Sequence, residues 1–203
     1  EFIDVLPTGR VGLMSVVFTP VGVRDILHLP LNELTNRYVS LEEVLGREGK
    51  DMEEQMMNLS GFDERVEGLE SFLLGRLQRR NEFENNRMRM VMTRLLQCRG
   101  MFNVEQLAGY ACLSRKQFER VFAAYVGLMP KQYLRVIRFL YAVEFRNRMP
   151  EVDLATLAFH TGYYDAAHLA NEIKALTGHT SSTLFQLMCF SEDAESIEWF
   201  LGA

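Results

Sequence analysis

The chain has 203 residues, of which 48% are hydrophobic and 24% charged, and this composition is typical of a globular protein with one large or two small domains. No apolar run approaches the roughly 20 residues that a membrane helix needs, which excludes a membrane-spanning helix. The net charge of −5 disfavours a nucleic-acid partner at first, but it is unevenly distributed: residues 81–187 carry +4, residues 1–80 carry −5 and residues 188–203 carry −4.

The cysteines Cys98, Cys112 and Cys189 are odd in number and scattered along the chain. Together with eleven methionines, this usage predicts a reducing cytosol rather than a disulfide framework. We therefore expect a cytoplasmic protein.

Residues 2–29 are rich in Val, Ile, Leu and Phe and are punctuated by Pro and Gly, which predicts β-strands. A sheet of so few strands could not be stable alone. We therefore expect further strands before Glu1, and we interpret residues 1–80 as the remainder of a truncated, β-containing sensor domain.

After Pro30 the pattern becomes helical. Ser40 and Glu43 have the spacing of a capping box at the start of one helix. A second helix follows in "DERVEGLESFLLGRLQ", whose stripe of apolar residues packs either into its own domain or against the same helix of a second subunit; the stripe comprises Val66, Leu69, Leu73 and Leu77.

A polar stretch, "RRNEFENNR", predicts a domain boundary near Asn81. Helix then continues through "MRMVMTRLLQC" and is expected to end near Gly100. The domain that we expect here spans residues 81–187, and residues 188–203 form a separate acidic tail.

Residues 103–127 have the layout of a helix-turn-helix. Asn103, with Gln106 three residues later, caps a short helix. Ser114, with Gln117 three residues later, caps a second helix that ends at Gly127. A short helix, a three-residue turn and a second capped helix are typical of this motif.

Residues 153–178 repeat the pattern. Asp153 caps the first helix, Gly162 supplies a turn residue that can take positive φ, and Asp165 caps a second helix that ends at Gly178. One long linker helix over residues 130–148 is predicted between the copies, with Pro130 in its first turn.

Residues from about 103 to 185 resemble the DNA-binding domain of AraC-family bacterial transcription regulators. The first unit carries the family's Leu-Ala, Ser, Arg-x-Phe and Gly-x-x-Pro-x-x-Tyr elements at Leu107, Ala108, Ser114, Arg120, Phe122, Gly127, Pro130 and Tyr133. The second unit carries the family's other motif at Gly162, Tyr163, Asp165, His168, Leu169, Lys174 and Gly178, and Arg138 matches the linker-helix arginine.

The sequence departs from the family pattern at three places. Cys112 stands where many members have Gly, Met129 replaces the Ser cap of the linker helix, and "GHTSSTLF" replaces the closing motif. Upstream, "LPLNELTNRYVSLEEVLG" is similar to the end of a sensor domain found ahead of some members.

The resemblance implies a mainly α domain and a sequence-specific transcription regulator, which we expect to be an activator that responds to a small-molecule effector. Its expected partners are a duplex DNA operator and an unidentified effector, with RNA polymerase and a second copy of the chain as further candidates. We predict no catalysis and no cofactor.

The predicted DNA contacts lie on both second helices. In the first unit, Lys116, Glu119 and Arg120 can read bases, while Arg115 and Gln117 contact the backbone. In the second unit the exposed set is Ala167, His168, Asn171 and Lys174. Alanines cannot make the bidentate pairs that discriminate bases, so this second unit is expected to anchor rather than read.

His160, His168 and His179 suggest zinc, but the last two are separated by a whole helix and no cysteine pair with ligand spacing lies nearby, so we predict no metal site. No nucleophile elbow and no phosphate-binding Gly-rich loop is present in the sequence. Two alternatives remain: a small-molecule enzyme or sensor with a helical regulatory appendage, and a protein-interaction module that has lost DNA binding.

Overall fold

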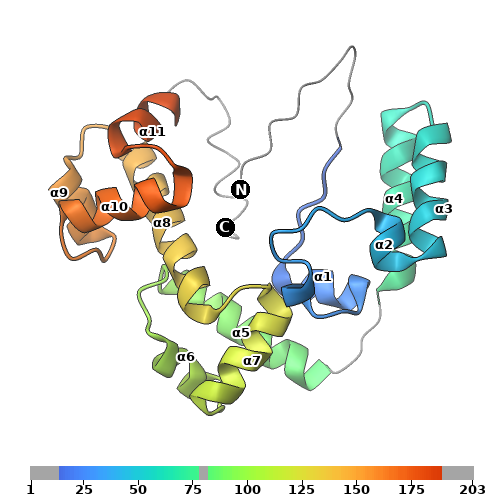
Figure 1. Cartoon of the computed structure of the whole chain (residues 1–203), viewed down its shortest axis with the longest axis horizontal. Helices are drawn as coiled ribbons and strands as arrows, with labels where there is room; N and C mark the ends of the chain where they lie inside the picture. Colours follow the sequence, from blue (N-terminus) through green and yellow to red (C-terminus); the bar gives the residue numbers. More distant parts are fainter. Residues whose placement is uncertain (1–13, 78–81, 189–203) are drawn as a thin grey trace. The chain divides into compact units, whose positions relative to one another are not determined.

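The structure is a computed structural model that describes residues 14–77 and 82–188 (Figure 1). Within those two ranges the regular structure is helical, with no strand. The chain divides into two compact units. The first comprises Glu1–Asn86 with Arg120–Leu128, and the second comprises Arg87–Glu119 with Met129–Ala203.

The prediction of a β-containing N-terminal domain is wrong. Residues 14–19 have no regular structure, and helix α1 occupies Pro20–Leu27, where strands were expected. Thr19 Oγ1 caps the helix by accepting from Gly22 N at 3.1 Å, and Pro20 sits in the first turn, where no N–H is needed. Val21 and Ile26 are buried within this helix, so tertiary burial overrides the β-propensity of Val and Ile.

The first residues of the predicted strand region, including "FIDVL", lie outside the described residues. The same holds for the acidic segment 189–203.

Four further helical elements follow α1 in the first compact unit. They are the 3₁₀ helix η1 (Leu31–Glu33), α2 (Leu41–Leu45), α3 (Arg47–Asn58) and α4 (Phe62–Arg76). The predicted capping box is confirmed: Ser40 Oγ accepts from Glu43 N at 3.1 Å, and Ser40 N donates to Glu43 Oε2 at 2.9 Å. The helical run does not continue unbroken, because Gly46 has φ of +62° and separates α2 from α3.

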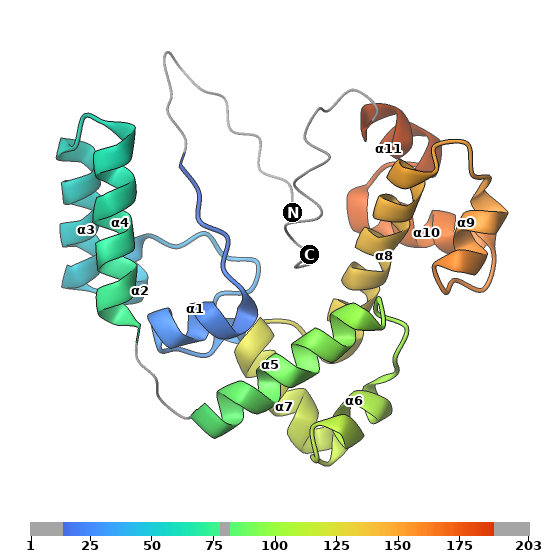
Figure 2. The ribbon, with the colours of Figure 1, turned by 180° about the vertical axis from the view of Figure 1, so that it is seen from behind.

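Helices α3 and α4 form a hairpin in the first unit (Figure 2). The predicted stripe on α4 is partly covered there: Val66, Leu69 and Leu73 are half-buried, and Leu77, just after the helix, is 47% exposed. The methyl end of Met56 lies so close to Gly68 that an added Cβ would stand 2.9 Å from it. At 3.6 residues per turn Gly68 lies on the side of α4 opposite to the stripe, so this contact with α3 belongs to another face of the helix.

Helices occupy the segments in which the sequence predicts two helix-turn-helix units and a linker helix. After α5 (Glu82–Gln97), the first helix-turn-helix unit consists of α6 (Val104–Tyr110) and α7 (Arg115–Val126). The linker helix is α8 (Pro130–Arg148). The second helix-turn-helix unit consists of α9 (Leu154–His160) and α10 (Ala166–Thr177), and α11 (Ser181–Met188) follows it.

The second helix-turn-helix unit has its own apolar core, built on α8. Ala142, Leu157, Ala158, Tyr163, Leu169 and Ile173 form a buried cluster. Helix α10 contacts α8, α9 and α11, and α9 contacts α8, which fixes the second unit on the C-terminal half of the linker helix (Figure 1). Burial of this kind is the main stabilising contribution for such small helices.

Corresponding residues of the two turns share a left-handed backbone. Gly162 has φ of +75°, as its position in the second turn predicts, and Cys112 has φ of +54° in the first turn. The first turn therefore keeps its shape despite losing glycine, at the steric cost of a Cβ in this region. None of the described helices combines the length and apolarity needed to cross a membrane.

Candidate nucleic-acid interface

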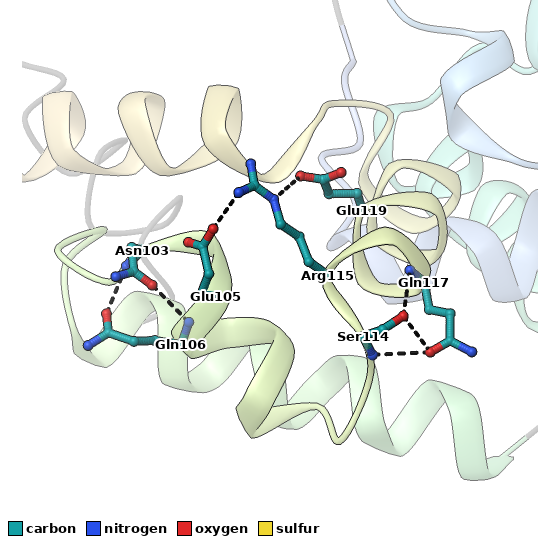
Figure 3. Close-up of polar contacts among 7 residues, drawn as sticks. All are labelled: Asn103, Glu105, Gln106, Ser114, Arg115, Gln117 and Glu119. Carbon is teal, nitrogen blue, oxygen red and sulfur yellow. Dashed lines mark hydrogen bonds and ion pairs between the residues drawn. The ribbon is translucent and has the colours of Figure 1, made fainter.

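Two reciprocal capping boxes fix where α6 and α7, the helices of the first helix-turn-helix unit, begin (Figure 3). Asn103 Oδ1 accepts from Gln106 N at 2.8 Å, and Asn103 N donates to Gln106 Oε1 at 2.9 Å. Ser114 N donates to Gln117 Oε1 at 3.1 Å, and Gln117 N donates to Ser114 Oγ at 3.4 Å. Ser114 Oγ also donates to Gln117 Oε1, at 2.8 Å. Both predicted caps are confirmed, and the start of the recognition helix α7 is fixed by its own sequence.

Gln117 takes part in the cap that the sequence predicts, and this limits what its side chain can offer to DNA. Its Oε1 is used by Ser114, so only the Nε2 amide protons are left for another partner. A phosphate accepts from such a donor, whereas a base edge that needs a donor and an acceptor from one amide cannot be read while the cap is intact.

Arg115 and Glu119 lie in one ion-pair cluster with Glu105, which is on α6 (Figure 3). Arg115 Nε donates to Glu119 Oε1 at 2.9 Å, and Arg115 Nη1 donates to Glu105 Oε1. The hydrogen bond from Glu119 and the charges of both carboxylates raise the pKa of Arg115 above its usual value. Arg115 is therefore held by two carboxylates in the DNA-free chain, and Glu119 has one oxygen occupied.

Lys116 and Arg120 are exposed and lie four residues apart, on one side of α7. Among the described side chains, neither has a hydrogen-bond or ion-pair partner. These two cations are thus available to an acceptor such as a phosphate or the O6 and N7 atoms of guanine.

His168 completes a reciprocal cap at the start of the second recognition helix, α10. Asp165 Oδ1 accepts from His168 N at 2.7 Å, and His168 Nδ1 accepts from Tyr164 N at 3.3 Å. In a neutral imidazole the proton then resides on Nε2, which is a donor. The exposed His168 can therefore donate to a phosphate without losing its structural bond.

Ala167, Asn171 and Lys174 are exposed on α10, in agreement with the face that the sequence predicts. The neighbouring Glu172 is engaged elsewhere: Arg135 of α8 donates to it bidentately, at 2.8 and 2.9 Å. This bidentate, charge-assisted pair joins the linker helix to the second recognition helix.

Arg138, on the linker helix, bridges two segments of the second compact unit. Its Nη2 donates to Gly100 O at 3.0 Å, and its guanidinium lies 5.7 Å from the centre of the Tyr163 ring. A Cβ added at Gly100, which has φ of +69°, would come within 2.7 Å of Leu134 O, so the turn packs directly on α8. Arg138 thus ties the turn before α6 to the plug residue of the second unit.

The three histidines of the C-terminal half occupy ordinary structural positions. The ring of His160 stacks on Phe145 at 5.2 Å, His168 lies in the α10 cap, and His179 N donates to Thr177 Oγ1. Over the described part of the chain, no group of three or more His, Cys, Asp or Glu side chains is arranged to hold a metal ion.

Comparison with known proteins identifies this region. Residues 107–186 match the family described as a helix-turn-helix domain. Residues 107–186 form an AraC-type helix-turn-helix domain. A stretch of 73 residues is also 30% identical to an uncharacterized HTH-type transcriptional regulator of Haemophilus influenzae; it makes up 36% of this chain and 24% of that protein. No solved structure matches the chain.

The chain therefore spans about a quarter of the curated relative that it matches. Sequence reasoning missed the roles of Glu105, just before the AraC-type domain, and of Arg135 and Glu172 within it; the partners of all three lie on other helices. The signal of Glu105 in the sequence is weak, because an acidic residue in a first turn is usually interpreted as a favourable charge at the helix start.

Proposed function

We propose that this protein is a sequence-specific DNA-binding transcription regulator. The observation that carries the proposal is the AraC-type domain with two capped recognition helices, of which the first presents Lys116 and Arg120 exposed and available to an acceptor. The relative named as a transcriptional regulator supports the same function. No step of this function requires catalysis or a cofactor.

In this proposal, base reading depends mainly on α7. Arg120 and Lys116 can each donate to guanine O6 and N7 in the major groove. Glu119 can accept from cytosine N4 with its second oxygen while Arg115 keeps the first. Arg115 and the free amide of Gln117 are positioned near the start of the helix, where backbone contacts fix its register.

The second recognition helix, α10, has a different proposed role. Ala167 offers only a methyl group, Asn171 alone can read an adenine, and His168 and Lys174 can hold phosphates. Because Glu172 is bound to Arg135, the one acidic reader on this helix is not available. The second unit therefore anchors the protein on DNA and contributes little to the choice of sequence.

Systematic base substitution in a DNA site selected from a random pool tests this division of roles. Changes under the first unit should each weaken binding by roughly 1–3 kcal/mol, whereas changes about one helical turn away should have small effects. Equal or larger effects under the second unit would show that α10 reads sequence and would contradict the anchor role.

We further propose that the N-terminal unit responds to a small, mainly apolar molecule. A groove of about 540 Å³ in this unit is lined chiefly by apolar side chains; they include Val16, Val17, Phe18, Val23, Leu34 and Val126. Its volume lies within the usual range for small-molecule sites. RNA polymerase and a second copy of the chain remain predicted partners.

A fluorescence titration with 1-anilinonaphthalene-8-sulfonate tests the groove. Wild-type protein should enhance the dye's emission, and Val17→Asp should reduce it, because Val17 is 58% exposed in the lining and a carboxylate disfavours an apolar guest. Val16→Thr, which keeps the size of the side chain, serves as a control. Equal enhancement by wild type and Val17→Asp would contradict the proposal that the groove binds an apolar molecule.

A further inference from the structure

The C-terminal end of the first recognition helix is completed by residues far outside the AraC-type domain. The last carbonyls of a helix have no partner within the helix and need one from elsewhere. At the end of α7, Ala124 O accepts from Arg24 Nη1 at 3.1 Å, and Gly127 O accepts from Thr35 Oγ1. Arg24 is on α1 and Thr35 follows η1, so the N-terminal segment supplies both donors.

Arg24 is matched to this position by charge as well as by hydrogen bonding. A cation is favoured at a helix C-terminus, where the backbone dipoles leave partial negative charge. Its guanidinium also lies 4.2 Å from the centre of the Tyr125 ring, close enough for a cation–π interaction. Three contributions of different kinds thus hold α1 to one turn of α7.

The second contact leaves no spare room. Gly127 has φ of +82°, and a Cβ added there would lie 3.0 Å from Thr35 Oγ1 and 3.1 Å from Leu31 O. Glycine is therefore required both by the backbone conformation and by the close approach of the η1 segment. A shift of Thr35 away from α7 would break its hydrogen bond to Gly127 O.

A buried polar network beside Arg24 adds the start of α5 to the same junction. Tyr125 OH donates to Asn85 Oδ1 at 2.7 Å, and Asn85 Nδ2 donates to Asp25 Oδ1 at 2.5 Å. All three side chains are buried, and burial raises the pKa of Tyr125 to about 12. A satisfied buried network specifies one arrangement of the helices that it joins.

All of these residues lie in one compact unit, which also contains Arg120–Leu128 of the recognition helix. The half of α7 that carries Arg120 is thus packed with the N-terminal segment. We propose that Arg24 and Thr35 are positioning residues for DNA reading: they clamp the C-terminal end of α7 and transmit the conformation of residues 19–36 to the first recognition helix. This inference rests on the proposed DNA-binding function.

The double variant Arg24→Met/Thr35→Val tests the clamp. Methionine keeps an apolar stem and removes the charge and donors, and valine keeps the shape of threonine without its hydroxyl. Arg37→Met is the matched control, because Arg37 is exposed and donates to Glu33 O rather than to a carbonyl of α7. The single variant Thr35→Ser keeps the hydroxyl that Thr35→Val removes, and it should behave as wild type.

The first readout needs no DNA. In hydrogen-exchange mass spectrometry of the free protein, peptides covering residues 120–128 should exchange faster in the double variant than in wild type, while peptides over α9 and α10 stay unchanged. Unchanged exchange over 120–128 would overturn the clamp whether or not the protein binds DNA. Faster exchange over the whole chain would show general destabilisation and would also overturn it.

The second readout is base discrimination on the selected DNA site. The double variant should lose roughly 3- to 30-fold of discrimination at base pairs under the first unit and none at base pairs under the second. A purely structural role would lower affinity for all sequences alike, and that result would contradict a positioning role. Failure of wild type to bind any DNA would instead reject the proposed function and leave the exchange result to decide the clamp.

Discussion

Replacing Arg120 with alanine should weaken binding to the selected DNA site by roughly 1–3 kcal/mol, which is about 5- to 150-fold, and should relax the preference at one base pair. The reason is that Arg120 is exposed on α7, has no partner among the described side chains, and can form two hydrogen bonds to one guanine. Fluorescence anisotropy with the site and its single-base variants measures both effects.

Two other variants separate base reading from loss of charge. Lys174→Ala should weaken binding to all sequences by a similar factor, because Lys174 is proposed to hold a phosphate. Arg47→Ala removes one positive charge from α3, where Arg47 faces solvent and its ion pair with Asp51 spans 3.8 Å, and should leave discrimination unchanged. An Arg120→Ala protein with wild-type affinity and preference would show that this side of α7 does not read DNA.

A large effect on stability is expected at Tyr163. Tyr163→Ala should lower the free energy of unfolding by about 3–5 kcal/mol, as for other buried aromatic residues, because Tyr163 is 6% exposed and belongs to the core of the second helix-turn-helix unit. The adjacent Tyr164 is 92% exposed, so Tyr164→Ala should change stability by less than about 0.5 kcal/mol. Urea denaturation of the three proteins gives the comparison.

Tyr163→Phe isolates the hydroxyl group. Tyr163 OH is buried without a hydrogen-bond partner in the described part of the chain, so its removal should be neutral or stabilising by up to about 1 kcal/mol. The ring remains, with its contact to Arg138. A clear loss of stability in Tyr163→Phe would mean that the hydroxyl has a partner after all.

The C-terminal helices could be predicted from the sequence because residues close by in the sequence cap the helix starts. Asn103, Ser114 and Asp165 cap helices within three residues of themselves, and all three bonds are present in the structure. Asp153 behaves in the same way: its bonds to Thr156, first the side chain and then the backbone, lower its pKa. Such contacts depend on short spacings that a sequence shows directly.

The N-terminal prediction failed because two local signals competed. The Val and Ile residues around Gly22 favour strands, while Thr19 and Pro20 favour a helix start. The packing of Val21 and Ile26 decides for the helix, and burial is a non-local quantity. The contacts of Arg24 with Ala124, 100 residues away, and of Arg135 with Glu172 are non-local for the same reason.

The most direct test of the account is the salt dependence of binding to duplex DNA. The proposed phosphate and base contacts of two helix-turn-helix units neutralise several phosphates and release counterions, so log K should fall linearly with log salt. For about four contacts, affinity should fall roughly 100-fold between about 50 and 200 mM salt. An anisotropy titration that shows this slope would support DNA binding by the AraC-type domain; absence of binding at the lowest salt, or affinity indifferent to salt, would contradict it.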